Sequence, residues 1–282
     1  MKVLVFGKTG QVAAELQRQT DVTALGRNDA DLGNPTICAD IISNTDADVI
    51  INAAAFTAVD RAEEEEELAT FINGEAPAAM AKAAAARGIP FLHISTDYVF
   101  DGSGTHAWAT TDEPAPLGAY GRTKLLGEQG VENADGTFAI LRTAWVFSAH
   151  GENFVKTMLR LGKDRDTLNI VDDQIGGPTP ASDIAATLLA MARAFHSGQG
   201  ASGTYHYAGS PNVSWKEFAR EIFAQANIAV KVSGIPTSDY PTPATRPSNS
   251  RLDCGSLEET FGIARPDWRL GLKQVLQDVG EI

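Results

Sequence analysis

Cysteine is scarce in this chain, and no long hydrophobic run is present. The two cysteines, Cys38 and Cys254, lie far apart and show no metal-binding spacing. This excludes a disulfide framework and indicates free thiols in a reducing cytoplasm. No apolar stretch approaches the roughly 18 residues of a membrane span, and glycines break the apolar N-terminal run, unlike a signal peptide. We therefore expect a cytoplasmic protein without a membrane partner.

Positive charge is also in deficit. The 282 residues include 23 Lys and Arg against 36 Asp and Glu, a formal net charge of -13. This argues against a nucleic-acid partner and against adherence to anionic membranes, but a phosphorylated small molecule needs only local positive charge. With 43% hydrophobic residues, the chain can form one large domain or two unequal ones.

A glycine-containing loop follows an apolar run at residues 1–6, which predicts a buried strand. The loop at residues 7–13 has the spacing G-x-x-G-x-x-A, and a helical pattern continues to about Gln19. Glycines allow close backbone approach, and the N-terminus of a helix offers N–H groups to a pyrophosphate. The segment predicts a dinucleotide site rather than an ordinary strand-turn-helix. The residues concerned are Gly7, Thr9, Gly10, Gln11 and Val12.

The second predicted strand, residues 22–25, ends without the acidic residue that an NAD-specific site would carry. Arg27 stands there instead, and its guanidinium suits the geometry of a 2′-phosphate. NADPH is therefore favoured over NADH, although NADH stays possible because Arg27 could be an ordinary surface residue.

Two further apolar runs, residues 48–52 and 90–95, predict buried strands. Small residues at positions 53–55 let the backbone lie close to a flat ligand. Thr96 follows the later strand, where ligands of open α/β sheets bind, and Ser95 is the fallback. Between them, the acidic run at 63–67 predicts a solvated helix start, and the helix continues to Arg87 before Gly88.

Tyr120 and Lys124 are four residues apart on a predicted helix that runs to about Val131, and so share one face. The ammonium of Lys124 should favour the phenolate and bring the tyrosine pKa from about 10 toward neutrality. Such a tyrosine can exchange a proton with a carbonyl or alcohol oxygen. Because Tyr-x-x-x-Lys also occurs by chance on solvated helices, the interpretation depends on the glycine loop and on Thr96.

The rest of the chain predicts a strand at 138–143, helices near 153–161, 183–195, 215–226 and 270–279, and a short strand at 204–207. Asp183 is expected to cap its helix. Residues 101–119 are rich in Gly, Pro and Thr and predict a substrate-side loop. Residues 236–247 contain four prolines and predict a loop or a binding arm.

Taken in order, these blocks resemble the extended short-chain dehydrogenase/reductase family. The resemblance implies an α/β fold: a doubly wound Rossmann-type parallel sheet at 1–147, completed by about 170–208, with a smaller substrate-binding α/β region at 148–169 and 209–282. The blocks that carry it are residues 6–12, 52–55, 57–60, 95–100, 120–124, 142–146, 153–154 and 240–250.

The resemblance also implies a reaction, in which hydride passes from NADPH to C4 of a dTDP-linked 4-keto-6-deoxy sugar. Tyr120 would deliver the proton, Lys124 would lower its pKa and hold the nicotinamide ribose, and Thr96 would bind the carbonyl. Implied substrate contacts are Thr96, Asp97, Tyr120, Trp145, Asn153, Arg246, Asn249 and Ser250. Implied cofactor contacts beyond the glycine loop and Arg27 are Asp31, Leu32, Ala53, Ala54, Ala55, Thr57, Ile94, Tyr120 and Lys124.

Some members of the family bind Mg²⁺ at a dimer contact. Glu15 matches one of the acidic ligands, but Ser182 stands where another is expected. Because a single carboxylate is a poor Mg²⁺ site, we assign no metal and leave monomer or homodimer open.

Four alternatives belong to the same superfamily. A dehydratase would follow Thr96 with an Asp-Glu pair, whereas here Asp97 precedes Tyr98. A ketoreductase for another nucleotide sugar or an epimerase stays possible, as does a non-catalytic NADP-binding regulatory subunit. The intact set of Thr96, Tyr120 and Lys124 favours catalysis.

Overall fold

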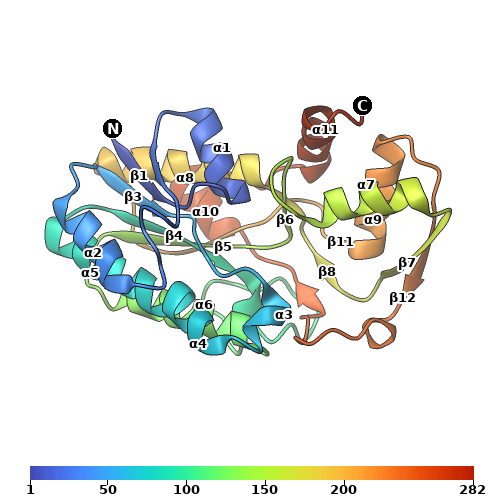
Figure 1. Ribbon diagram of the computed structural model, residues 1–282, viewed down its shortest axis with the longest axis horizontal. Helices are drawn as coiled ribbons and strands as arrows, with labels where there is room; N and C mark the ends of the chain where they lie inside the picture. The colour runs from blue at the N-terminus through green and yellow to red at the C-terminus, as the bar shows by residue number, and fades with distance from the viewer.

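A computed structural model describes residues 1–282 and shows a six-stranded parallel sheet covered by helices on both faces (Figure 1). The strand order is β2-β1-β3-β4-β5-β10, and every neighbouring pair is parallel. The predicted doubly wound α/β fold is thus confirmed. The strands are β1 Val3–Phe6, β2 Thr23–Leu25, β3 Val49–Asn52, β4 Phe91–Thr96, β5 Phe138–Thr143 and β10 Gly203–Tyr207.

Alternation along β1 divides the core of this sheet into two halves. Val3 and Val5 join the cluster under α1 (Gln11–Gln19) and α8 (Ala181–His196), whereas Leu4 and Phe6 join the cluster on the opposite face. That face is covered by α2 (Pro35–Asn44), α5 (Ala76–Arg87) and α6 (Ala119–Glu132). Because both faces are buried, the strand is apolar throughout, and each such side chain contributes about 1.5–3 kcal/mol.

The strand order reverses beside β1. The chain leaves β1 for β2 on one side and then returns to β3 on the other. At such a switch point the helices leave in opposite directions, so a crevice opens at the carboxyl ends of the strands. Here those ends are Gly7 and Ala53, the residues that follow β1 and β3.

The acidic run at 63–67 lies at a helix start, as the sequence predicted, with Glu66 and Glu67 in a first helical turn, but two of its carboxylates also contact α6. The segment forms α3 (Val59–Ala62), α4 (Glu66–Thr70), a π-helical turn at Phe71–Glu75 and then α5. Glu63 Oε1 accepts a hydrogen bond from the Ala119 N–H at 2.9 Å, and Glu66 pairs with Arg122 on α6. Gly118 leaves room for this contact, since a Cβ there would lie 2.5 Å from Glu63 Oε1. The run therefore fixes the start of the helix that carries Tyr120.

A second core lies beside the sheet, on the right of Figure 1. It is built by α7 (Phe154–Asp164), α9 (Trp215–Gln225) and α11 (Trp268–Asp278), with the parallel strands β7 (Thr167–Val171) and β12 (Lys231–Ile235). Ser214 and Glu217 form a capping box at the start of α9. The predicted domain boundaries stay a proposal. The shorter elements are β6 Val146–Phe147, β8 Ile175–Gly176, β9 Thr179–Pro180, β11 Val213–Ser214, β13 Asn249–Ser250, α10 Gly255–Phe261 and the 3₁₀ turns Asp97–Val99 and Thr237–Asp239.

Two helix starts differ from the prediction. Pro180 is the N-cap of α8, so Asp183 lies in the first helical turn rather than at the cap. Asp267 caps α11 through the Arg269 N–H, and that helix begins at Trp268. None of the helices combines the length and the apolar character that a membrane crossing requires.

Candidate active site

The glycine loop lies against the end of β3. Gly7 has a φ of 111°, and a Cβ there would stand 3.2 Å from the backbone of Ala53 and Ala54. Gly10 is the N-cap of α1 without a side-chain cap, and the N–H groups of the next three residues have no backbone acceptor. These free donors at a helix N-terminus suit a pyrophosphate. The glycine loop and the residues that follow β3 therefore lie against each other, at the carboxyl ends of β1 and β3.

Arg27 lies beyond β2 with 74% of its side chain exposed. Its Nε is 3.9 Å from Asp31 Oδ1, and Asp31 also accepts the Gly33 N–H at 2.9 Å. Leu32 is buried in the core, and Thr57 is exposed. The guanidinium of Arg27 is thus free to turn toward a 2′-phosphate, which is the role that we propose for it.

Thr96, Asp97 and Tyr120 converge at the end of β4. Thr96 Oγ1 donates to Asp97 Oδ1 at 3.2 Å and accepts the Tyr98 N–H at 3.2 Å. Burial raises the pKa of Asp97 to about 6, although the hydroxyls of Ser250 and Thr96 oppose that shift. Asp97 Oδ2 is buried without a hydrogen-bond partner. An unpaired buried acceptor is costly, so this oxygen is suited to a substrate hydroxyl.

The pKa of Tyr120 differs from the sequence prediction. Burial raises it to about 12, the nearby Asp97 carboxylate raises it further, and only the Thr96 hydroxyl acts to lower it. The prediction that Lys124 brings this phenol toward neutrality is therefore wrong for this arrangement, because the ammonium points elsewhere. A phenol that keeps its proton is suited to donate it, which is the direction that a reduction needs.

Lys124 is buried beneath the site, with only 2% of its surface exposed. Its Nζ donates to Ile94 O at 2.7 Å and lies 3.1 Å from His93 Nε2. Burial lowers the pKa of Lys124 to about 8, while Glu128 acts to raise it. The predicted cofactor residue Ile94 thus contacts Lys124 through its carbonyl oxygen.

Trp145 packs against the second core. It has a φ of 49°, a left-handed conformation that is uncommon for so bulky a residue. Its ring stacks on Trp215 with centroids 3.6 Å apart. A Cβ on Gly176 would approach both the Trp145 ring and Ser250, so only glycine lets these three residues meet. Trp145 is therefore held beside Ser250, which in turn adjoins Asp97.

The proline-rich arm is fastened to α3 through Asp60. Arg246 Nη2 donates to Asp60 Oδ2 at 2.8 Å, and the Ala244 N–H donates to Asp60 Oδ1 at 3.1 Å. Arg246 Nη1 is buried without a partner. This free donor suits a phosphate or carbonyl oxygen of a substrate, and we keep Arg246 as a proposed substrate contact.

Unlike Arg246, Asn249 uses the polar atoms of its side chain in hydrogen bonds within the protein. Its Nδ2 donates to the carbonyls of Ser103 and His106, and its Oδ1 accepts from Arg251. A buried amide with all these partners holds the loop at 101–107 in place and has little left for a ligand. We therefore propose a supporting role for Asn249 instead of the predicted contact with the dTDP part of the substrate.

The predicted cofactor and substrate residues also meet at Gln11. Gln11 Oε1 accepts hydrogen bonds from Ser148 Oγ and Asn153 Nδ2, both at 3.0 Å. Asn153 also caps α7 by accepting the Lys156 N–H. The start of α1 is thus tied to the segment that leads into the second core.

The comparisons with known proteins agree with this geometry. The model of the RmlD substrate binding domain family matches residues 1–281. The dTDP-4-dehydrorhamnose reductase of Burkholderia thailandensis is 44% identical over 295 residues, covering 99% of each chain. The solved dTDP-4-dehydrorhamnose reductase of Bacillus anthracis, in complex with NADP, matches with a TM-score of 0.92 and 33% identity over 99% of this chain and 100% of its own. That of Clostridium acetobutylicum matches with a TM-score of 0.91 and 38% identity over 98% and 99%.

The chain belongs to the RmlD family. Its predicted likeness to the extended short-chain dehydrogenases/reductases is therefore confirmed for the family and for the fold.

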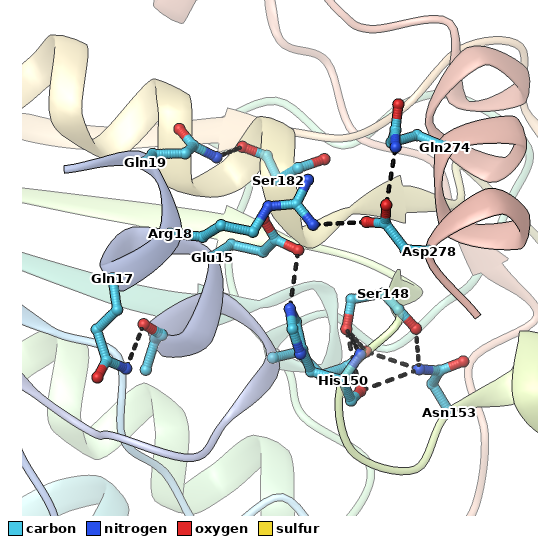
Figure 2. A network of polar contacts seen from close by, with 12 residues as sticks. Glu15, Gln17, Arg18, Gln19, Ser148, His150, Asn153, Ser182, Gln274 and Asp278 are labelled. Carbon is cyan, nitrogen blue, oxygen red and sulfur yellow. Dashed lines mark hydrogen bonds and ion pairs between the residues drawn. The ribbon is translucent and has the colours of Figure 1, made fainter. Parts of the chain in front are cut away.

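In this RmlD family member, the carboxylate considered for Mg²⁺ has other partners. Glu15 is buried, and its carboxylate lies 3.2 Å from His150 Nε2 and 3.5 Å from Arg18 Nε (Figure 2). Arg18 continues to Asp278 at 2.5 Å, and Gln19 donates to the Ser182 carbonyl. No group of three or more His, Cys, Asp or Glu side chains surrounds Glu15. No metal is assigned.

Sequence reasoning missed two polar residues of the RmlD site. Asn52 and His93 are fully buried, and the sheet register places them side by side on β3 and β4. Both were visible in the sequence: Asn52 ends the apolar run of β3, and His93 interrupts the apolar part of β4. Such residues need hydrogen-bond partners, and for His93 one of those partners is Lys124.

Proposed function

We propose that the protein reduces the C4 keto group of dTDP-4-dehydro-L-rhamnose to give dTDP-L-rhamnose, with NADPH as the reductant. The observation that carries this function is that Thr96 and Tyr120 meet at the end of β4, while Lys124, one turn along the same helix, donates to Ile94 O of that strand. Membership of the RmlD family and the full-length relatives support the choice of substrate.

The residues present suit the cofactor. The backbone of Ala53 and Ala54 lies so close to Gly7 that a side chain there would be crowded. The free N–H groups after Gly10 can bind the pyrophosphate. Arg27 would take the 2′-phosphate, and Lys124 would face the nicotinamide ribose. When bound, NADPH supplies the hydride for C4.

The chain's own residues supply the proton and the orientation. When the substrate binds, Thr96 would turn its single hydroxyl hydrogen from Asp97 Oδ1 to the keto oxygen and polarise it. As the C4–H bond forms, Tyr120 transfers its phenolic proton to that oxygen, so that the product is an alcohol and Tyr120 becomes a phenolate. Lys124 then stabilises the phenolate, which regains a proton from solvent.

Asp97 and Trp145 hold the sugar in this arrangement. The unpaired Asp97 Oδ2 accepts a hydroxyl of the sugar, and the indole of Trp145 covers its apolar face. Arg246 binds the dTDP part through its free Nη1. The predicted cytoplasmic location, and the choice between monomer and homodimer, stay predictions.

The test mixes purified protein with NADPH and dTDP-4-dehydro-L-rhamnose, and follows absorbance at the nicotinamide band. We expect one NADPH consumed for each dTDP-L-rhamnose formed, with the product identified by chromatography and mass spectrometry. An epimerase would return its reducing equivalent and leave NADPH unconsumed. A UDP-linked 4-keto-6-deoxy sugar is the control for the nucleotide.

Conversion of the 4-keto sugar to an isomer without net NADPH oxidation would contradict the proposal in favour of epimerisation. NADPH binding without turnover of any 4-keto nucleotide sugar would favour a regulatory subunit. Faster turnover of the UDP-linked control would refute the dTDP specificity alone.

A further inference from the structure

A buried chain of polar groups runs from β3 through β4 to α6 and ends on Lys124. The Ala54 N–H donates to Asn52 Oδ1 at 3.2 Å, and Asn52 Nδ2 lies 3.1 Å from His93 Nδ1. On the other side of the ring, His93 Nε2 lies 3.1 Å from Lys124 Nζ. Asn52 and His93 are both wholly buried.

The hydrogen-bond inventory of this chain fixes the position of each proton. Asn52 Oδ1 is already an acceptor, so its amide nitrogen is the group that faces His93, and it must donate to Nδ1. A neutral imidazole that accepts at Nδ1 carries its hydrogen on Nε2. That hydrogen points at Lys124 Nζ, which can accept it only as a neutral amine. If Lys124 were an ammonium, its N–H donor would face the Nε2–H donor of His93, with no acceptor between them.

We propose that Asn52 and His93 are positioning residues that favour the neutral amine of Lys124 and so set the upper pH limit of catalysis. The inference rests on the proposed function, in which the ammonium form of Lys124 supports Tyr120. It adds that Asn52, on β3, influences the protonation state of Lys124 through the imidazole of His93. The strand β3 itself does not touch the reacting atoms.

The other charged groups near Lys124 oppose or share this effect. On α6, Glu128 stabilises the ammonium, and Arg142 of β5 holds that carboxylate. Tyr120 lies one turn away on the same helix, and Asp97 faces Tyr120 from the end of β4. Burial keeps the pKa of His93 well below its usual value, so this ring stays neutral. The balance places the pKa of Lys124 at about 8.

Asn52→Asp reverses the proton order of the chain. One carboxylate oxygen can still accept the Ala54 N–H, and the other accepts a hydrogen from His93 Nδ1. His93 Nε2 then becomes an acceptor for the Lys124 ammonium, so every donor meets an acceptor. We expect the alkaline limb of kcat/KM for the sugar, at about pH 8 in the parent protein, to move up by about one pH unit.

The control is Asn44→Asp, which adds the same charge on the exposed end of α2 and should leave the limb in place. In Asn52→Asp/His93→Leu, the imidazole no longer relays the change, and the upward shift should disappear. A limb that Asn52→Asp leaves unchanged or moves downward overturns the proposal, and so does a shift that persists without His93.

A second measurement needs neither substrate nor variant. Nitrogen-15 NMR of the parent protein, with histidine labelled, distinguishes a ring nitrogen that carries hydrogen from one that does not. We expect His93 to carry its hydrogen on Nε2 at pH 9, with Nδ1 unprotonated. A hydrogen on Nδ1 at that pH overturns the proposal, whereas an enzyme with another substrate would still show the expected tautomer. The NMR result therefore separates a failure of this inference from a failure of the proposed function.

Discussion

The ion pair between Glu128 and Arg142 gives a prediction that the structure specifies in detail. Both side chains are almost wholly buried, at 1% and 5% exposed, between α6 and β5. Arg142 Nη2 donates to Glu128 Oε2 at 2.6 Å, and its Nε donates to Oε1 at 3.0 Å. In Glu128→Gln the guanidinium keeps its burial but loses its counter-charge, and the new amide hydrogens face its own N–H groups.

Breaking a buried pair from one side costs about 3–5 kcal/mol. Because Gln retains one acceptor oxygen and His206 lies 3.5 Å from Arg142 Nη1, we expect the lower end, about 3 kcal/mol. For a chain of this length, that loss lowers the melting temperature by about 5 °C. Urea denaturation followed by circular dichroism measures the free energy of unfolding, and calorimetry gives the temperature.

Two comparisons make the result decisive. Glu132→Gln changes an exposed carboxylate on the same helix and should stay within about 0.5 kcal/mol of the parent protein. Glu128→Gln/Arg142→Met removes both charges and should recover most of the loss, because no unpaired ion is left in the core. A loss below about 1 kcal/mol in Glu128→Gln would refute the reasoning, since the guanidinium would then have found water.

Three further substitutions test the proposed site. Tyr120→Phe should lower kcat by about a hundred- to ten-thousand-fold while NADPH affinity, measured by fluorescence titration, stays unchanged; near-normal turnover would exclude Tyr120 as the proton donor. Arg27→Ala should weaken NADPH about tenfold or more and leave NADH unaffected; an equal loss for both would remove its phosphate role. Asp97→Asn should weaken sugar binding yet raise the free energy of unfolding at pH 7.5 by up to about 3 kcal/mol, because burial raises the pKa of this carboxyl from 3.8 to about 6. The cost of the buried charge is absent below pH 3.8 and complete above about pH 6, so this gain should vanish in acid; a gain that is the same at pH 4 and pH 7.5 would point to packing instead.

Local signals in the sequence were enough for the sheet and for the glycine loop. β1, β3 and β4 are apolar runs followed by small or hydroxyl residues, and a parallel sheet brings the ends of such runs to one edge. The same rule predicted that Thr96 would stand at the edge of the sheet where ligands bind. These features depend on period and on spacing, which a single sequence displays.

The contacts that set proton positions depend instead on which side chains meet across the fold. Glu63 reaches the first turn of α6 from 56 residues away, which no spacing rule describes. Asn249 looks like a binding residue until its partners at Ser103 and His106 are known. The pKa of Tyr120 was predicted with the wrong sign because helical spacing places Lys124 near but does not say where its Nζ points.

That last error bears on how the reaction obtains its proton. A phenol with a pKa of about 12 and an amine with a pKa of about 8 favour opposite states at pH 7 to 8: Tyr120 keeps its proton, and Lys124 is close to losing one. Donation by Tyr120 leaves a phenolate in a buried site, and only then does a cation one turn away lower its free energy substantially. Lys124 therefore contributes mainly after proton transfer has begun, when the negative charge has appeared on the phenol. An interaction that is strong in the transition state and weak before it is the kind that raises kcat. A protonated Tyr120 with a pKa of about 12 therefore suits a reductase better than the readily ionised phenol, with a pKa near neutrality, that the spacing predicts.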